Sequence, residues 1–222
     1  MKIFHLPDTI KALAFDMDLT LYTNSEYGRY QIDKVVEKLG QLRGFSFEEM
    51  NCQIMEKRKA WALSHGGKAA SLSNILMGYG IGMEEIISWR EGLIEPALFI
   101  KEDEKLKAAL EKLRDGFVLG VVTNNPVLVA RKTLAALGVE TYFPFIIGLD
   151  TCMVAKPHKI PFEKFSELSR CPPETCVSVG DRYDIDLDIP LKMGMGGILV
   201  NGVEDVYCIP ELLFSRGGNY GV

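Results

Sequence analysis

The chain has 222 residues, of which 47% are hydrophobic, so it suits one substantial domain or one domain that carries a smaller insertion. Its net charge of -5 argues against a nucleic-acid partner, because phosphate backbones attract basic surfaces. No apolar run approaches the length of a membrane span, and the first residues lack the apolar core of a signal peptide. The five cysteines are odd in number and form no CxxC pair, which is typical of reduced thiols in a cytoplasmic protein.

The first predicted element is a short buried strand over residues 11–16. From about Thr23 to Pro96 the pattern changes to apolar residues at helical spacing, and no convincing strand interrupts it. Glycine-rich turns divide this stretch, so we expect a small helical bundle. Its helices are predicted around residues 32–42, over 46–64 and 68–79, and over 84–93.

After Pro96 short apolar strands alternate with helices. Strands are predicted over residues 117–122, 145–148, 176–179 and 197–200, and helices around 106–113, 127–137, 159–169 and 187–193. The first strand must join this sheet, because alone it would not bury both of its faces. The sequence therefore predicts an α/β fold, a doubly wound Rossmann-like parallel sheet with an inserted helical bundle. The core domain would comprise residues 1–22 and 97–222, and the insertion residues 23–96.

Polar residues that can bind ligands or take part in catalysis follow the predicted strands. They lie at the edge where such sheets bind ligands. They are Asp16 and Asp18 after the first strand, Thr123 and Asn124 after the next, Lys156 in the following loop, and Asp181 and Asp186 after a later strand. Paired acids at the end of a buried strand need a partner, and a divalent cation is a suitable one. The set therefore predicts one polar site at this edge.

Phosphoryl transfer is the chemistry that such a set suggests. A carboxylate can attack phosphorus and form an aspartyl-phosphate, which divides one difficult displacement into two easier steps. Mg²⁺ would neutralise the approach of two anions, and it prefers carboxylates and phosphate oxygens. A lysine and a threonine hydroxyl would bind the other phosphoryl oxygens, and a second acid would protonate the leaving oxygen.

The four segments resemble, in order, the four motifs of the haloacid dehalogenase superfamily of phosphohydrolases, and together they cover essentially the whole chain. The resemblance implies Asp16 as nucleophile and Asp18 as general acid/base. It implies Thr123, Asn124 and Lys156 as phosphate ligands. The metal ligands would be Asp16, Asp18 and Asp181, and Asp186 would support the metal. Asp18 would bind the metal through its backbone carbonyl. The insertion after the first motif is similar to the cap of that family, which closes over the substrate.

The branches of this family are partly separable. Haloalkanoate dehalogenases lack the second acid of the first motif, so Asp18 argues against dehalogenation. The segment Leu19-Thr20-Leu21-Tyr22 resembles the pyrimidine 5'-nucleotidase-like branch. We therefore expect a magnesium-dependent phosphatase acting on a small phosphorylated metabolite, a nucleoside monophosphate or a sugar phosphate. A phosphomutase of the same superfamily and a catalytically silent binding protein on the same fold remain alternatives.

Several polar residues near these motifs also have plainer interpretations. Thr123 would also suit a helix cap before Pro126. Asp184 and Asp188 are interpreted as first-turn helix acids rather than metal ligands. Arg182 and Tyr183 are interpreted as loop surface rather than as substrate contacts.

Residues of the insertion are also candidates for reading the substrate. Trp61, Trp89, Arg58, Arg90 and His65 are tempting, but the tryptophans are expected in the core and His65 at a helix end. Tyr22, Thr23 and Asn24 would face the substrate or form the hinge. Leu19 replaces the glycine or asparagine usual in the family, which would alter the turn after the acids.

Overall fold

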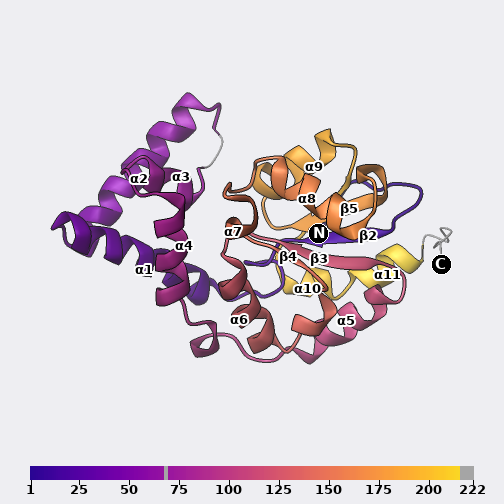
Figure 1. Ribbon diagram of the computed structural model, residues 1–222. Helices are drawn as coiled ribbons and strands as arrows, with labels where there is room; N and C mark the ends of the chain where they lie inside the picture. The colour runs from indigo at the N-terminus through magenta and orange to yellow at the C-terminus, as the bar shows by residue number, and fades with distance from the viewer. Residues whose placement is uncertain (68–69, 216–222) are drawn as a thin grey trace.

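A six-stranded sheet crosses the computed structural model, which describes residues 1–67 and 70–215 (Figure 1). The strand order is β1-β6-β5-β2-β3-β4; β1 is antiparallel to β6 and all other neighbours are parallel. This confirms the α/β fold with a doubly wound, mostly parallel sheet, and β2 lies in its interior. The strands are β1 (Lys2–His5), β2 (Ala12–Phe15), β3 (Val118–Val122), β4 (Ile146–Ile147), β5 (Cys176–Gly180) and β6 (Gly196–Leu199).

Helices cover both faces of the sheet, and a further group lies to one side of it (Figure 1). The side group consists of α1 (Ser25–Arg43), α2 (Phe47–Ser64), α3 (Leu72–Met77) and α4 (Met83–Leu93). The others are α5 (Glu104–Arg114), α6 (Val127–Leu137), α7 (Leu149–Cys152), α8 (Ile160–Ser169), α9 (Asp188–Lys192), α10 (Val203–Val206) and α11 (Ile209–Phe214).

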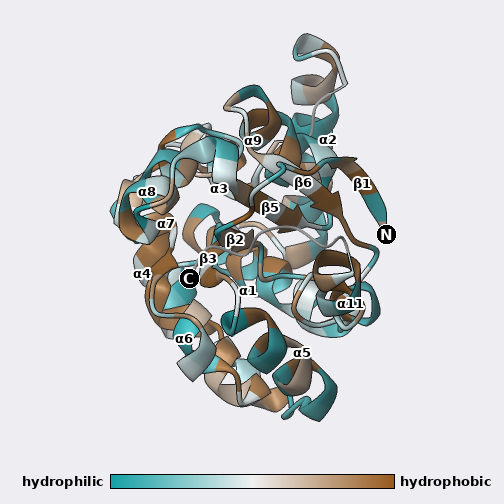
Figure 2. Ribbon diagram, turned by 90° about the vertical axis from the view of Figure 1, so that its right-hand side faces the viewer, coloured by the Kyte–Doolittle hydropathy of each residue, from teal (hydrophilic) through white to brown (hydrophobic). Residues whose placement is uncertain are grey.

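The central strand β2 is buried on both faces, and its side chains alternate between two apolar cores. Leu13 and Phe15 belong to the larger core, which the helices α5, α6, α10 and α11 complete. Ala12 and Ala14 belong to the smaller core, where Phe162 of α8 packs. Figure 2 shows the apolar strands in brown and the polar outer surfaces of the covering helices in teal. Burial on both faces explains why the strand reads as a continuous apolar run.

The helices α1 to α4 occupy the stretch of chain between β2 and β3, where the sequence predicts a bundle; we call them the helical insertion. They share an apolar core, to which Leu39 of α1 and Trp89 of α4 contribute and which Leu149 of α7 joins from the other side. Side chains fix the helix starts, because Asn24 accepts the Tyr27 N–H and Ser46 forms a capping box with Glu49. The insertion is therefore a packed unit beside the sheet.

The structure also contains elements that the sequence analysis did not predict. All four residues of the edge strand β1 are exposed, so no alternation of buried and exposed residues predicts it, and α10 and α11 are only four and six residues long. The helix expected at 187–193 begins earlier, as a π-helical turn over Tyr183–Leu187 that continues into α9. Of the helix expected over 68–79, residues 68 and 69 lie outside the described part of the chain, and α3 covers Leu72–Met77.

Two expectations from composition are compatible with the structure. All five cysteines are free thiols, and Cys171 and Cys176 among them are buried. Within residues 1–67 and 70–215, no helix combines the length and the apolar character needed to cross a bilayer.

Candidate active site

Asp16 follows directly after β2 and lies at the carboxyl edge of the sheet. Its carboxylate is 5% exposed and accepts hydrogen bonds from Lys156 Nζ at 2.6 Å and from Thr20 Oγ1 at 3.2 Å. The same Lys156 nitrogen donates to Asp186 Oδ1 at 2.6 Å. Burial lowers the pKa of Lys156, but the two carboxylates outweigh burial and raise it, so the amine is an ammonium. One buried cation thus bridges two buried acids.

Asp181 lies after β5 and completes a cluster of three acids. Carboxylate oxygens of Asp16, Asp181 and Asp186 lie within 4.8 Å of one another. Burial first, and then the charges of Asp16 and Asp186, raise the pKa of Asp181 to about 7. The Oδ1 atom of Asp181 is buried and has no hydrogen-bond partner. A divalent cation with oxygen ligands fits this cluster, because it would satisfy that oxygen and offset the repulsion.

Asp186 is held in place on both of its oxygens. Oδ1 accepts from Lys156, and Oδ2 accepts from the backbone N–H of Arg182 at 3.1 Å. Its backbone carbonyl accepts from Ser178 Oγ at 2.7 Å. Gly180 makes room for it, because a Cβ at that glycine would lie 2.4 Å from the Cβ of Asp186. With both oxygens engaged, Asp186 is arranged to orient Lys156 and to support the cluster.

Thr123 and Asn124 lie in the loop after β3. The Thr123 hydroxyl accepts the N–H of Asn125 at 3.2 Å, while α6 begins at Val127, after Pro126, without a side-chain cap. The helix-cap interpretation of Thr123 is therefore wrong, since its oxygen closes a turn two residues onward. Asn124 Oδ1 accepts the Lys156 N–H at 2.6 Å, and its Nδ2 donates to the Lys156 carbonyl at 3.2 Å. This pair ties the loop after β3 to the lysine-bearing loop.

The carboxylate of Asp18 takes no part in the acidic cluster and instead bonds toward the insertion. Tyr22 Oη and Gln31 Nε2 donate to Oδ1, the latter at 2.7 Å, and Asn125 Nδ2 donates to Oδ2 at 2.9 Å. Asn125 also accepts from Arg90 Nη1 at 2.7 Å and donates to Gln31 Oε1 at 2.8 Å. The sequence analysis missed Gln31, because an isolated amide on a helix gives no signal of its partners, and it assigned no role to Asn125, which follows the strand-end residues Thr123 and Asn124. The network joins α1 and α4 to the sheet edge.

Leu19 occupies the turn position for which the sequence comparison within the family expects glycine or asparagine. Its φ is 60°, in the left-handed region that a leucine adopts only at a cost of about 1–2 kcal/mol. The chain therefore takes a left-handed turn after the acids even with leucine at this position, and it bears the strain. Leu19 packs partly against the larger core and lines the cavity described next.

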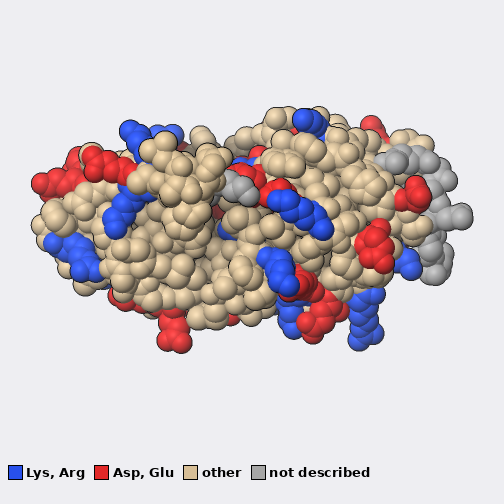
Figure 3. All heavy atoms as spheres, turned by 90° about the horizontal axis from the view of Figure 1, so that it is seen from above, with Lys and Arg blue, Asp and Glu red and all other residues tan. Residues whose placement is uncertain are grey.

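A cavity of about 410 Å³ lies between the strand-end loops and the insertion. Figure 3 shows a hollow between these two parts, with acidic and basic side chains beside it. Asp18, Asn124 and Asp181 form its wall at the sheet edge. Arginines from both parts also line it: Arg29 of α1, Arg58 of α2, Arg90 of α4 and Arg182 of the loop after β5. The Arg182 side chain is 49% exposed, in agreement with its interpretation as loop surface, although it also lines this cavity. Tyr183 is 42% exposed, as expected.

The aromatic residues of the insertion divide into a core residue and an outer one. Trp89 is 8% exposed and belongs to the core of the insertion, as predicted. Trp61 is only half-buried and stacks on the ring of His65 at 4.0 Å between centroids, so its predicted place in the core is wrong. His65 ends α2 as its C-cap, as expected.

Asp184 and Asp188 lie in the first turns of the π-helical segment and of α9, in agreement with their interpretation as helix acids. The acidic cluster found in the described residues contains neither of them. Asp188 accepts instead from Lys192 one turn onward, at 2.9 Å.

Two residues at the junction of insertion and sheet point away from the cavity. Thr23 Oγ1 accepts the N–H of Val203 at 2.9 Å, and Asn24 Nδ2 donates to the Phe99 carbonyl at 3.0 Å. Together with Tyr22 they line a separate hollow. Of the two roles considered for these residues, the contacts of Thr23 and Asn24 favour the hinge. The Tyr22 hydroxyl instead donates to Asp18, in the wall of the cavity.

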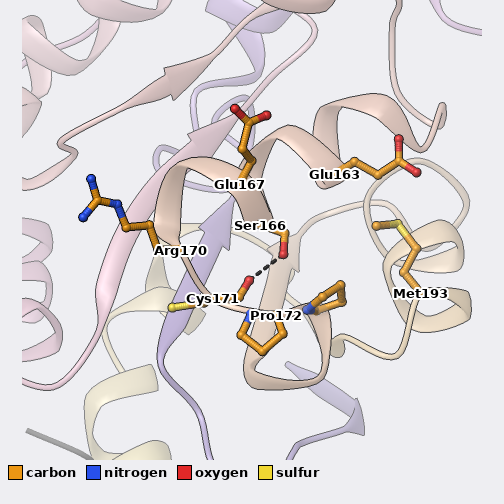
Figure 4. A pocket seen from close by; sticks show the side chains of 8 residues that line it. Glu163, Ser166, Glu167, Arg170, Cys171, Pro172 and Met193 are labelled. Atoms are coloured by element: carbon orange, nitrogen blue, oxygen red, sulfur yellow. Dashed lines mark hydrogen bonds between the residues drawn. The ribbon is translucent and has the colours of Figure 1, made fainter.

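Another hollow lies along α8 and is lined by Glu163, Ser166, Glu167, Arg170, Cys171, Pro172, Pro173 and Met193. Ser166 Oγ donates to the Cys171 carbonyl there, and the charged side chains point outward (Figure 4). Pro172 and Pro173 precede β5, so this hollow faces the amino end of that strand, away from the acids. It gathers no convergent catalytic groups.

Comparisons with known proteins match most of the chain. A family model described as haloacid dehalogenase-like hydrolase matches residues 10–194, which include every strand-end residue above. The phosphoglycolate phosphatase of Aquifex aeolicus is 28% identical over 187 residues, 83% of this chain and 82% of the relative. The glyceraldehyde 3-phosphate phosphatase of Methanocaldococcus jannaschii is 26% identical over 190 residues, 84% of this chain and 82% of the relative. The crystal structure of a HAD phosphatase from Thermococcus onnurineus superposes with a TM-score of 0.63 at 22% identity, covering 96% of this chain and 100% of that one.

Proposed function

The chain belongs to the haloacid dehalogenase-like hydrolases and is a phosphatase, and we propose that it hydrolyses a small phosphorylated metabolite through an aspartyl-phosphate at Asp16. One observation carries this proposal. The buried Lys156 ammonium bridges Asp16 and Asp186 beside an Asp181 oxygen that has no hydrogen-bond partner and lies 3.7 Å from the Nε of Arg182. Such a constellation stabilises negative charge and leaves a place for a cation.

Mg²⁺ is the proposed cofactor, because hard oxygen donors surround the place that a cation would take. The carboxylates of Asp16 and Asp181 and the backbone carbonyl of Asp18 would hold it. When bound, it neutralises phosphoryl charge and orients the phosphate against the nucleophile. Asp186 would hold Lys156 in position and, by accepting the backbone N–H of Arg182, the loop after β5.

The proposed reaction has two steps. A carboxylate oxygen of Asp16 forms a bond to phosphorus while the bond from phosphorus to the alcohol oxygen breaks, and Asp18 gives that oxygen a proton. Asp18 then takes a proton from water, the water oxygen attacks phosphorus, and inorganic phosphate leaves with Asp16 restored. Lys156 and Asn124 bind phosphoryl oxygens. The Thr123 hydroxyl already accepts from Asn125, so its own proton is available to a further phosphoryl oxygen.

The helical insertion, with residues 23–96 as its proposed limits, would act as a cap. Gln31 and Arg90 reach from it to Asp18 and Asn125, so contacts across the cavity hold the two parts together. A closed cap excludes water other than the attacking molecule and strengthens the electrostatic interactions inside.

The substrate classes proposed from the sequence are nucleoside monophosphates and sugar phosphates. The named relatives add phosphoglycolate and glyceraldehyde 3-phosphate, which are smaller esters. We also propose the cytoplasm as the place of action, since five free thiols suit a reducing compartment.

Phosphate release from a panel of these four ester types, with Mg²⁺ and with a chelator, tests the proposal. Wild type should release phosphate only with Mg²⁺, and Asp16→Asn should release none. Asp8→Asn removes one carboxylate from an exposed loop and should behave as wild type. A rearranged sugar phosphate without free phosphate would show a phosphomutase instead. Binding of Mg²⁺ with no turnover of any ester would favour a silent binding protein.

A further inference from the structure

The wall of the cavity opposite the acids is strongly basic. Arg58 projects from α2 and Arg90 from α4, and Arg29 and Arg182 lie along the same cavity. The proposed chemistry uses none of these guanidinium groups, because the phosphoryl group has Lys156, Thr123 and Asn124. The cavity therefore carries more positive charge than a single phosphate requires.

Two of these arginines have buried donor atoms without partners. The Nε atoms of Arg58 and Arg90 are buried and make no hydrogen bond. The Arg90 side chain is only 8% exposed, and its Nη1 is the atom that holds Asn125. A guanidinium offers five donors and no acceptor, and a buried donor without a partner is costly. Both side chains line the cavity, so their guanidinium groups lie beside any acceptor that enters it.

The acids of the cavity are committed to other groups. Asp18 already accepts from Tyr22, Gln31 and Asn125, and Asp181 belongs to the acidic cluster. In residues 1–67 and 70–215 no salt bridge joins Arg58 or Arg90 to a carboxylate. Burial lowers the pKa of Arg58, and the charge of Arg182 lowers it further, so this guanidinium faces repulsion rather than compensation. An anion in the cavity would relieve both effects.

We propose that Arg58 and Arg90 form a second anion-binding subsite, which rests on the proposed phosphatase function and narrows its substrate. The substrate is a phosphate monoester whose alcohol portion carries a second anionic group, a carboxylate or another phosphate. The planar guanidinium fork matches both groups with two parallel hydrogen bonds. Nucleoside monophosphates and glyceraldehyde 3-phosphate carry no such group on the alcohol portion and are disfavoured.

Matched pairs of esters test this subsite. The first pair is 2-phosphoglycolate and its amide, phosphoglycolamide, which differ in one negative charge. The second pair is ethylene glycol bisphosphate and ethylene glycol monophosphate, which tests a second phosphate. Wild type should prefer the charged member of at least one pair by about 10- to 100-fold in kcat/KM, the range for hydrogen bonds to a charged group.

Substitutions in α2 test whether Arg58 causes the preference for the charged ester. Arg58→Gln should reduce the ratio of kcat/KM within the preferred pair to near one, through a higher KM for the charged ester, and Arg58→Lys should retain part of it. The adjacent exposed residue supplies the control, since Lys59→Gln removes the same charge outside the cavity and should keep the ratio. The ratio compares two esters on one protein sample, so a partly unfolded variant does not distort it.

The outcomes separate the subsite from the function itself. Equal kcat/KM within both pairs for wild type, or a preference that Arg58→Gln leaves intact, would overturn the subsite while the phosphatase function stands. A loss of preference in Lys59→Gln as large as in Arg58→Gln would also overturn it, since general charge would then explain the effect. No phosphate release from any ester would instead overturn the proposed function.

Discussion

The two walls of the cavity differ in how far their charged groups are compensated by partners within the chain. At the sheet edge, Asp16, Lys156 and Asp186 are buried, and the lysine bonds to both acids. Strand β2 positions Asp16, a loop carries Lys156, and the π-helical turn after β5 carries Asp186. On the insertion, Arg58 and Arg90 come from helices and keep buried Nε atoms without partners. The first wall is nearly complete within the chain, while the second lacks an acceptor. The difference accords with our proposal that reaction chemistry belongs to the sheet edge and substrate choice to the insertion.

Removing the central cation should have the largest effect of any change at the sheet edge. Lys156→Met would leave Asp16 and Asp186 as uncompensated buried acids, at a cost of about 3–5 kcal/mol in the free energy of unfolding. Denaturant unfolding in the presence of a chelator measures it, and phosphate release should be lost as well. Lys192→Met is the matched control, because the Lys192–Asp188 pair is exposed and should contribute below about 1 kcal/mol. Equal effects of the two changes would contradict the central role of Lys156.

The acidic cluster should respond to Mg²⁺ through Asp181. At a concentration of 100 times the Kd, Mg²⁺ should stabilise wild type by about 2.7 kcal/mol. Asp181→Asn should lose most of this gain, yet exceed wild type in stability with chelator, because it removes one of three repelling carboxylates. Thermal unfolding with and without Mg²⁺ distinguishes these results. An unchanged Mg²⁺ effect in the variant would place the metal elsewhere.

The hydrogen bonds that join the insertion to the sheet edge should have a smaller effect on activity. Gln31 comes from the insertion and donates to Asp18, so Gln31→Leu should lower kcat about 10-fold, the equivalent of about 1.4 kcal/mol for a hydrogen bond to a charged group. Gln41→Leu changes the same residue type at an exposed position of α1 and should leave kcat unchanged. Steady-state kinetics with a denaturation curve for each variant separates positioning from loss of fold. An unaltered kcat in Gln31→Leu would show that the sheet edge orients Asp18 without help from the insertion.

The turn at Leu19 should show the smallest effect. Asparagine adopts the left-handed conformation more readily than leucine, but the change removes apolar contact with the larger core. These effects oppose each other, so Leu19→Asn should alter the free energy of unfolding by less than about 1 kcal/mol. Equilibrium denaturation measures the difference. A loss above about 2 kcal/mol would mean that the packing of Leu19, not the turn, holds this segment.

The sheet edge was readable from the sequence because strand ends impose a strict geometry. Parallel strands place residues such as Asp16 and Asp181 at one edge, so their proximity follows from their places in the chain. The short exposed strand β1 escaped prediction, because its residues carry no buried pattern. The π-helical turn before α9 also has no signature that apolar spacing would reveal.

The side chains that line the insertion side of the cavity were much harder to predict from the sequence. Arg58 and Arg90 lie on different helices, and helical periodicity indicates which face is buried but not which helices meet. Trp61 illustrates the same limit, since its spacing favours the core while it stacks on His65 outside. Arg182 follows Asp181 in a loop, and only the approach of the insertion turns that loop into a cavity wall.

Trapping of the covalent intermediate tests most directly the claim that the sheet edge carries the chemistry. Wild type would be quenched during turnover of 2-phosphoglycolate with Mg²⁺ and treated with borohydride, which reduces an aspartyl-phosphate to homoserine. Peptide mass spectrometry should then find homoserine at position 16, and none in samples without ester. Phosphate release with homoserine at another position, or with none at all, would contradict Asp16 as the nucleophile.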